Sequence, residues 1–327
     1  NSKISTYLTF IVNTVNDVNG EKIISIPTIV LPIGISFFTL KIISCHVEVY
    51  RGNIQAPSLW DYVLYVSLFT QILSGPIMRV NDFIPQLSSS KFDREQARSG
   101  AFMIIMGLFK KLLIANMAMP YVDKVHENIS GVPALALWTA AFLYAIELYA
   151  DFSGYSDIAI GCAKCLGYDF MTNFNLPYIS RSVTEFWRRW HISLSGWLRD
   201  YLYIPLGGNR CGKFRQLVNL MITMLLGGLW HGAKWTFVFW GGLNGLALCT
   251  EKIFSSRKKS TGIFTGLMKI VAVFSFISFT WIFFRAENFY DAWVVIRGIF
   301  ILQDGIRQPF FWTFASLAIL IDRKSVV

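Results

Sequence analysis

Charged side chains are scarce in this chain. Asp, Glu, Lys and Arg make up 15% of its 327 residues and hydrophobic residues 54%, whereas a soluble globular domain carries about 25% charged residues. The mean hydropathy is +0.47. This composition excludes an ordinary soluble protein and predicts an all-α, polytopic membrane protein, because a helix satisfies its own backbone hydrogen bonds inside lipid.

Cysteine is also rare, and the five cysteines are scattered and odd in number. That pattern argues against a disulfide framework. The one close pair, Cys162 and Cys165, has no second pair and no nearby histidine to complete a tetrahedral zinc site. We interpret both as packing residues and expect no bound metal or cofactor. The G-x-S-x-G motif of serine-nucleophile hydrolases is absent as well.

Basic residues outnumber acidic ones by 30 to 20, for a net charge of +10. Nucleic acid binding does not explain this excess, because Lys and Arg fall in short clusters between apolar runs rather than on one continuous face. Such clusters are typical of cytoplasmic loops and lipid-headgroup contacts. One of them, Gly207 to Lys213, nearly matches a phosphate-binding loop, but Phe214 stands where a hydroxyl residue is needed, so we interpret it as a basic loop.

Apolar segments of about the length that crosses a bilayer, roughly 20 residues, recur along the chain. Gln71 interrupts the second segment. Lys110 and Lys111, at the middle of the third, either snorkel to the interface or mark an interfacial helix. The predicted spans, the last of them short, are Ile23–Val47, Leu59–Met78, Ala101–Met119, Val132–Ala150, Phe214–Trp230, Trp235–Phe254, Ile263–Phe284 and Pro309–Ile321.

Basic clusters predict the orientation, because cytoplasmic loops are rich in Lys and Arg. The clusters at 210–215, 257–259 and 323–324 are separated by pairs of predicted spans, so all three fall on one side. Between Asp151 and Arg215 there is no clean span. We expect re-entrant and interfacial helices that line a funnel there, because irregular backbone at membrane depth needs a protein-lined or water-filled cavity. Gly241 and Gly245 indicate close helix packing.

The chain begins at Asn1 rather than at a methionine, and it ends soon after a shortened apolar run. We therefore expect residues 1–327 to be a single membrane-embedded domain taken from a longer protein. Further spans would precede it, and its C-terminus would be truncated.

Two histidines lie in tryptophan-rich, largely apolar surroundings. His231 follows Trp230 at the end of an apolar run, and His191 follows Trp190. Ionisable groups inside membranes are costly, so such residues are candidates for function. A buried imidazole would stay uncharged and act as a base. The alternative for His231 is a structural histidine bonded to a backbone carbonyl. Arg188 and Arg189, which precede His191, either hold a neighbouring anionic group or contact lipid headgroups.

Acidic residues cluster ahead of this region. Glu147 and Asp151 are four residues apart on a helix predicted to end near Asp151, and Asp157 follows. We expect Glu147 and Asp151 to pair with arginines, since a charge at the bilayer centre costs about 2.5 to 3.5 kcal/mol. The expected partners are Arg188, Arg189 and Arg199. The alternative is that the acids hold one of the two histidines in its reactive tautomer.

Six ordered motifs between Ile26 and Glu251 resemble the membrane-bound O-acyltransferase family. They are PIGISFF at 32–38, VYRG at 49–52, GPI at 75–77, DFSGYSD at 151–157, NFNLPYISRS at 173–182, and the block from Thr184 to Ala233 that contains FWRRWH and LLGGLWHGA. The YIPLGGN run at 203–209 is similar to the bacterial alginate O-acetyltransferase branch rather than to the D-alanyl-transferring branch. Asn244 departs from the pattern, because relatives often carry histidine there.

The resemblance implies a membrane O-acyltransferase fold, with transmembrane helices around a funnel. It matches His231 to the essential family histidine and His191 to the second one. We expect His231 to be a general base. The supporting residues would be Asp151, Asp157, Trp190 and Trp230. The phosphates of the acyl donor would be held by Arg188, Arg189, Asn209, Arg210 and Lys213.

The expected reaction moves an acetyl group from a cytoplasmic thioester, either acetyl-coenzyme A or an acyl carrier, to hydroxyls of an extracytoplasmic polysaccharide. Transfer would be direct or through a partner acetyltransferase outside a bacterial inner membrane. Two alternatives stay open. Intramembrane acids and broken segments are typical of transporters and channels, although no internal repeat is visible. The departure at Asn244 is compatible with an inactive scaffold of a polysaccharide-modification complex.

Overall fold

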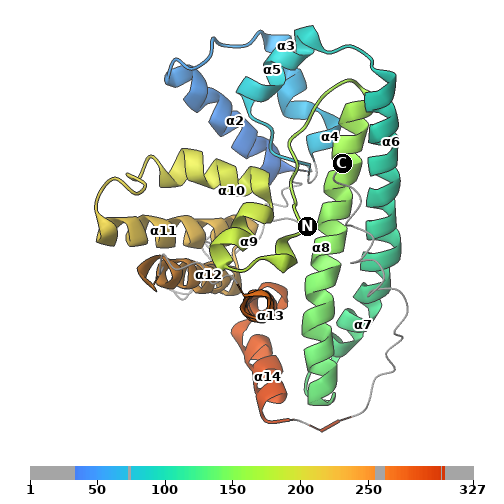
Figure 1. Cartoon of the computed structure of the whole chain (residues 1–327), viewed down its shortest axis with the longest axis vertical. Helices are drawn as coiled ribbons and strands as arrows, with labels where there is room; N and C mark the ends of the chain where they lie inside the picture. Colours follow the sequence, from blue (N-terminus) through green and yellow to red (C-terminus); the bar gives the residue numbers. More distant parts are fainter. Residues whose placement is uncertain (1–33, 73–74, 255–261, 303, 306–327) are drawn as a thin grey trace, which may run out of the picture.

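The computed structural model describes residues 34–72, 75–254, 262–302 and 304–305, and these residues form helices without strands. Two long helices, α6 and α8, run side by side (Figure 1), and α10, α11 and α12 lie to one side of them, roughly at right angles in the same view. Helices α2 to α5 occupy one end of the molecule and α14 the other. The all-helical prediction is therefore confirmed for the part of the chain that the structure describes.

The first described helices are shorter than the spans predicted there. Helix α2 (Ile35–Tyr50) covers the second part of the first predicted span, whose beginning lies outside the described residues. The second predicted span is wrong as a continuous helix, because the backbone turns at Leu68 (ψ 118°) between α3 (Leu59–Ser67) and α4 (Phe69–Ile72). Helix α5 (Val80–Ser89) follows.

Three helical stretches are long and apolar enough to cross a membrane, counted over the described residues. The first runs from Arg94 to Glu127 and is continuous through α6 (Arg94–Leu108), the π-helical segment η1 (Phe109–Ala115) and α7 (Asn116–Glu127). The others are α8 (Ala134–Cys165) and α13 (Ile263–Arg285). The apolar segments of the sequence thus predicted all three stretches. The chain is a membrane protein.

Two glycine pairs bring α6 and α8 into backbone contact. A Cβ on Gly100 would lie 2.5 Å from the carbonyl oxygen of Gly161, and one on Gly107 would lie 2.5 Å from that of Gly154. The reverse additions are as close, at 2.5 and 2.7 Å. Helices in lipid associate through such small residues, because close backbones gain van der Waals contact. Larger side chains at these positions would force the two helices apart.

Helix α8 continues to Cys165, so the prediction that it ends near Asp151 is wrong. Asp151 and Asp157 of α8 both pair with lysines of η1. Lys110 Nζ lies 2.9 Å from Asp157 Oδ2, and Lys111 pairs with Asp151. An arginine partner was expected for Asp151, and that expectation is also wrong. The two lysines and the two carboxylates lie on neighbouring helices and pair with each other. The lysines therefore do not have to extend to the membrane interface.

Short helices fill the stretch after α8. They are η2 (Pro177–Ile179), α9 (Val183–Arg189), α10 (Ile192–Leu198) and η3 (Arg199–Tyr203), and none is long enough to cross a membrane. The YLYIPL sequence, which looks strand-like, begins within the π-helical segment η3. This region lies between the long helices and the hairpin that follows (Figure 1).

Helices α11 (Lys213–His231) and α12 (Trp235–Phe254) form an antiparallel hairpin. Its backbones meet at Gly228 and Gly241, where added Cβ atoms would lie 2.2 and 2.3 Å from the carbonyl oxygens of Phe237 and Met224, so the predicted close packing is confirmed. Both helices match predicted spans in extent, yet neither is among the three stretches that qualify as spans.

Helix α14 (Phe289–Phe300) was not predicted, although Asn288 caps it by accepting a hydrogen bond from the Asp291 backbone N–H. The segment Pro309–Ile321 and the basic clusters at 257–259 and 323–324 lie outside the described residues.

Candidate functional site

A cavity of about 730 Å³ lies among α9, α10, η3, α11 and α12 and reaches the start of α5. One face of α11 lines it along most of that helix, through Gln216, Leu220, Thr223, Met224, Gly227 and His231. At 1.5 Å of rise per residue, Gln216 and His231 are about 22 Å apart along the helix axis. The cavity is therefore an elongated channel that has His231 at one end.

The His231 end is aromatic. His231 is the last residue of α11, it is partly buried, and its ring centroid lies 5.0 Å from Trp230, 5.4 Å from Trp240 and 5.1 Å from Phe284. Gly232 follows it, and a Cβ there would lie 2.7 Å from the Phe237 ring. The imidazole is thus held by large rings while it still borders the cavity.

The opposite end is polar and basic. Gln216 Nε2 donates to Tyr203 Oη at 3.3 Å, and Lys252 near the end of α12 lines the same region. Glu251 accepts hydrogen bonds from the backbone N–H groups of Val183 (2.5 Å) and Thr184 (2.9 Å), which ties the start of α9 to the end of α12. This contact fixes the wall from which Arg188 reaches the cavity.

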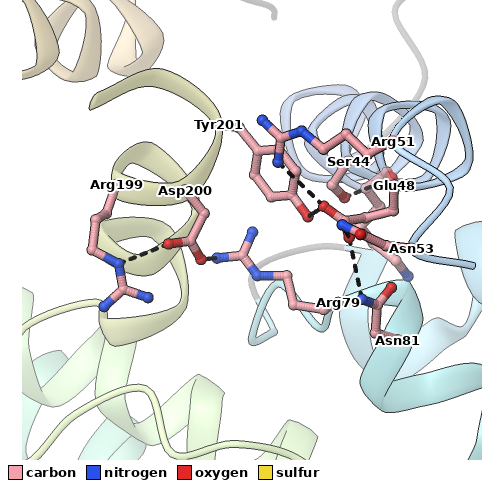
Figure 2. Close-up of polar contacts among 10 residues, drawn as sticks. Ser44, Glu48, Arg51, Asn53, Arg79, Asn81, Arg199, Asp200 and Tyr201 are labelled. Carbon is pink, nitrogen blue, oxygen red and sulfur yellow. Dashed lines mark hydrogen bonds and ion pairs between the residues drawn. The ribbon is translucent and has the colours of Figure 1, made fainter. Parts of the chain in front are cut away.

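Asp200 lies between two arginines on the cavity wall (Figure 2). Arg79 Nη2 donates to Asp200 Oδ2 at 2.8 Å, and Arg199 Nε donates to Asp200 Oδ1 at 2.7 Å. Arg79 also lies over the Tyr201 ring, 4.8 Å from its centroid, and Tyr201 Oη donates to Glu48 at 3.1 Å. Arg79 Nη1 is buried and has no partner among the described residues. Arg79 is therefore rigidly held, and its buried Nη1 lacks an acceptor.

Basic side chains outnumber acidic ones around the cavity. Four lining residues are basic and two are acidic, which leaves an excess of two positive charges. The basic residues are Arg79, Arg188, Arg199 and Lys252, and the acidic ones are Asp82 and Asp200. Such a lining favours an anionic ligand, because charge focused in a cleft attracts the opposite sign.

His191 is placed differently from His231. It does not line the cavity, its side chain is 2% exposed, and its Nδ1 lies 3.1 Å from Asn173 Oδ1. Its ring centroid is 4.7 Å from Phe152 and 6.4 Å from Trp230, the same indole that packs on His231. His191 lies outside the three candidate spans, and burial, together with the nearby His231, lowers the pKa of His191 well below its ordinary value.

Most of the predicted donor-binding residues lie elsewhere. Arg188 lines the cavity, whereas Arg189 pairs with Glu185 at 2.8 Å. Neither Arg189 nor the exposed loop residues Asn209, Arg210 and Lys213 border the cavity. The other basic residues that line the cavity are Arg79, Arg199 and Lys252. A single sequence gives little sign of this, because Arg79 is 121 residues from its partner Asp200.

The predicted supporting residues divide into two groups. Trp230 contacts both imidazoles, whereas buried Trp190 packs on Phe186 and Trp281, with ring centroids 5.5 and 5.2 Å apart. Asp151 and Asp157 bond lysines of η1. The departing residue Asn244 is buried in α12, where its Nδ2 donates to Trp240 O at 2.9 Å.

Comparison with known proteins agrees with these features. The model of MBOAT, the membrane-bound O-acyltransferase family, matches residues 15–286. The chain belongs to the membrane-bound O-acyltransferase family. It is 42% identical to the probable alginate O-acetylase AlgI of Azotobacter vinelandii over 290 residues, which are 88% of this chain and 56% of that protein. The predicted family resemblance is confirmed.

Two further relatives carry other names. The peptidoglycan O-acetyltransferase of Helicobacter pylori is 35% identical over 83% of this chain and 57% of its own length. The teichoic acid D-alanyltransferase of Bacillus subtilis is 27% identical over 79% of this chain and 69% of its own length. The chain spans little more than half the length of the alginate and peptidoglycan relatives, and it is more similar to them than to the D-alanyl-transferring protein.

Proposed function

We propose that this chain is the catalytic domain of a membrane O-acyltransferase that moves an acetyl group from a thioester to a polysaccharide hydroxyl. The observation that carries the proposal is the elongated cavity, which extends about 22 Å along α11 from Gln216 to His231 and has an excess of basic residues in its lining. A long, linear donor with phosphates at one end and a thioester at the other fits that arrangement. The family membership supports acyl transfer as its chemistry.

The donor enters from the cytoplasm in this proposal. The start of α11 follows a basic cluster at 210–215, and basic loops are typically cytoplasmic. The polar end of the cavity lies at the same end of the α11–α12 hairpin. Its basic residues Arg79, Arg188, Arg199 and Lys252 bind the donor's phosphates, with Arg79 Nη1 as a free donor. Acetyl-coenzyme A and an acetylated acyl carrier both present such phosphates.

His231 acts as the general base. It takes the proton of the acceptor hydroxyl while the hydroxyl oxygen attacks the acetyl carbonyl carbon. A C–O bond forms, the C–S bond breaks, and His231 returns the proton to the leaving sulfur. The aromatic rings around His231 exclude water, which would otherwise hydrolyse the thioester.

The acceptor is a polysaccharide outside a bacterial inner membrane. The relatives named for alginate and peptidoglycan acetylation support this substrate class. Acetyl groups pass to the polymer directly or through an acetyltransferase partner on the far side of the membrane. No bound metal or cofactor takes part in this scheme.

Reconstitution tests the proposal. The full-length protein that contains this chain is placed in liposomes with external [¹⁴C]acetyl-coenzyme A and enclosed deacetylated alginate. Labelled polymer is expected, and His231→Ala is expected to lower the rate by about 10²- to 10⁴-fold. Lys213→Ala is the matched control, because Lys213 is basic and exposed but does not border the cavity. Label that crosses the membrane without being transferred indicates a transporter and contradicts the proposal. If the wild type neither transfers the label nor lets it cross the membrane, with or without its membrane partners, the protein is an inactive scaffold and the proposal is contradicted.

A further inference from the structure

Asn173 is the hydrogen-bonding centre beside His191. It lies between α8 and η2, and 1% of its side chain is exposed. Its Oδ1 accepts from the Ser193 backbone N–H at 3.2 Å and from Ser193 Oγ at 2.9 Å, and it lies 3.1 Å from His191 Nδ1. Its Nδ2 donates to Ser156 Oγ of α8 at 3.1 Å. Asn173 therefore links His191 to the long helix α8.

These contacts fix which atom of the Asn173 amide faces His191. A backbone N–H only donates, so the Asn173 atom that meets the Ser193 N–H must be the oxygen. The same oxygen meets His191 Nδ1, and an oxygen of an amide only accepts. His191 Nδ1 therefore carries a proton. In the neutral ring Nε2 is then the unprotonated nitrogen.

The surroundings of Nε2 favour the neutral ring. Nε2 is buried and has no hydrogen-bond partner among the described residues. Aromatic rings surround the imidazole, with Phe152 at 4.7 Å, Trp230 at 6.4 Å and Phe174 at 6.5 Å between centroids. A protonated Nε2 would be a buried cationic donor with no acceptor, which costs far more than an unfilled lone pair.

The charge of His191 matters to His231. Trp230 packs against both rings, so the two histidines are neighbours across one indole. As a general base, His231 becomes an imidazolium during each turnover. A second positive charge at His191 would oppose that step, because like charges at short range disfavour each other in a low dielectric.

We propose that Asn173 is a positioning residue that holds His191 as the neutral Nδ1–H tautomer, so that His231 can accept the proton of the acceptor. The inference rests on the proposed function. Asn173 touches neither donor nor acceptor and acts through His191.

The charged groups on the elements packed against His191 face other partners or the cavity. On α9, Arg189 pairs with Glu185 and Arg188 lines the cavity. On α8, Asp151 and Asp157 bond Lys111 and Lys110. On α2, which contributes Phe37 to the ring contacts of His191, Lys41 donates to the carbonyl oxygen of Tyr65. From α11, His231 is the titratable neighbour. A carboxylate introduced at position 173 would therefore be the strongest new influence on the charge of His191.

Asn173→Asp tests the inference through the pH profile of acetyl transfer. The carboxylate keeps an acceptor for Nδ1–H but stabilises the imidazolium, so activity at pH 7 is expected to fall about tenfold or more and to recover as the pH rises to 9. Asn173→Leu keeps the size but lacks an acceptor, so its loss is expected at every pH. Asn175→Asp is the matched control, since Asn175 is exposed two residues away, and its profile is expected to follow the wild type. Equal losses for Asn173→Asp and Asn173→Leu at every pH would overturn the proposal.

A second measurement does not depend on the folding of any Asn173 variant. Solid-state NMR of the wild-type protein with ¹⁵N-labelled histidine, with the signal assigned by its loss in His191→Gln, is expected to show Nδ1 protonated and Nε2 unprotonated at pH 7. A proton on Nε2 would contradict the assignment. If the wild type transfers no acetyl group, the proposed function fails, while the tautomer is still decided by this spectrum.

Discussion

His191 and His231 occupy contrasting environments, although both pack against the same indole. His231 borders a cavity of about 730 Å³ that is lined by four basic residues, whereas His191 is 2% exposed and hydrogen-bonded to Asn173. Trp230 packs on both. The contrast agrees with the two proposed roles, in which the open imidazole meets the substrates and the closed imidazole sets the electrostatics for the open one.

The largest expected effect is a loss of stability when helix α8, which packs against His191, loses an ion pair. Helix α8 provides Phe152 and Ser156 to the surroundings of His191, and it is joined to η1 by the partly buried ion pair of Lys110 with Asp157. Asp157→Leu removes the carboxylate from this pair and is expected to destabilise the protein by about 3 kcal/mol, because a buried charge loses its ion-pair partner. Thermal unfolding in detergent measures the change. In Asp157→Leu combined with Lys110→Met, much of the stability should return, and a double variant as unstable as the single one would show that the pair contributes little.

Removing a charge from the open side is expected to weaken donor binding. Arg79→Ala removes the cation whose Nη1 is free in the cavity wall, and the KM for acetyl-coenzyme A should rise about tenfold, the equivalent of one charged hydrogen bond. The value of kcat should change much less, because in this proposal Arg79 binds the donor's phosphates and does not touch the reacting atoms. Lys213→Ala is the comparison, and a similar rise in its KM would mean that general surface charge, rather than this cavity, attracts the donor.

The smallest effect concerns pH and the closed side. Burial lowers the pKa of His191 in the folded state, so below about pH 6.5, the pKa of a free histidine, the unfolded chain binds more protons than the folded one. The stability contributed by His191 is therefore present above about pH 6.5 and is lost as the pH falls. Melting temperatures at pH 7 and pH 5 should differ less for His191→Gln than for the wild type. An identical difference in both proteins would place the acid sensitivity elsewhere.

The sequence predicts the uniformly apolar helices well. The predicted span Ile263–Phe284 differs from α13 by one residue, because apolar residues dominate it from end to end and Lys269 is its one charged residue before Arg285. The end of α8 was placed too early, since Ser153, Gly154 and Ser156 are typical of turns. In the structure Gly154 is needed inside the helix for its contact with Gly107, and a single sequence does not show that pairing.

The candidate site was predictable only in part. The Trp-His-Gly sequence pointed to His231, and the basic residues near it suggested an anionic donor. Which basic residues face the cavity depends on tertiary contacts: Arg79 meets Asp200, and Lys252 approaches through the α11–α12 hairpin. The loop at 209–213 has the richer local charge and yet lies outside the cavity. Local charge density is therefore a poor guide to a site formed by distant segments.

A structure of the full-length protein with acetonyl-coenzyme A, an analogue with a methylene group between sulfur and carbonyl carbon, tests the central claim most directly. The pantetheine arm is expected in the cavity along α11, with the carbonyl carbon within about 6 Å of the His231 imidazole, the sum of a hydrogen bond and a near-attack distance. An analogue bound outside this cavity, or with its carbonyl at the basic end beside Lys252, would contradict it.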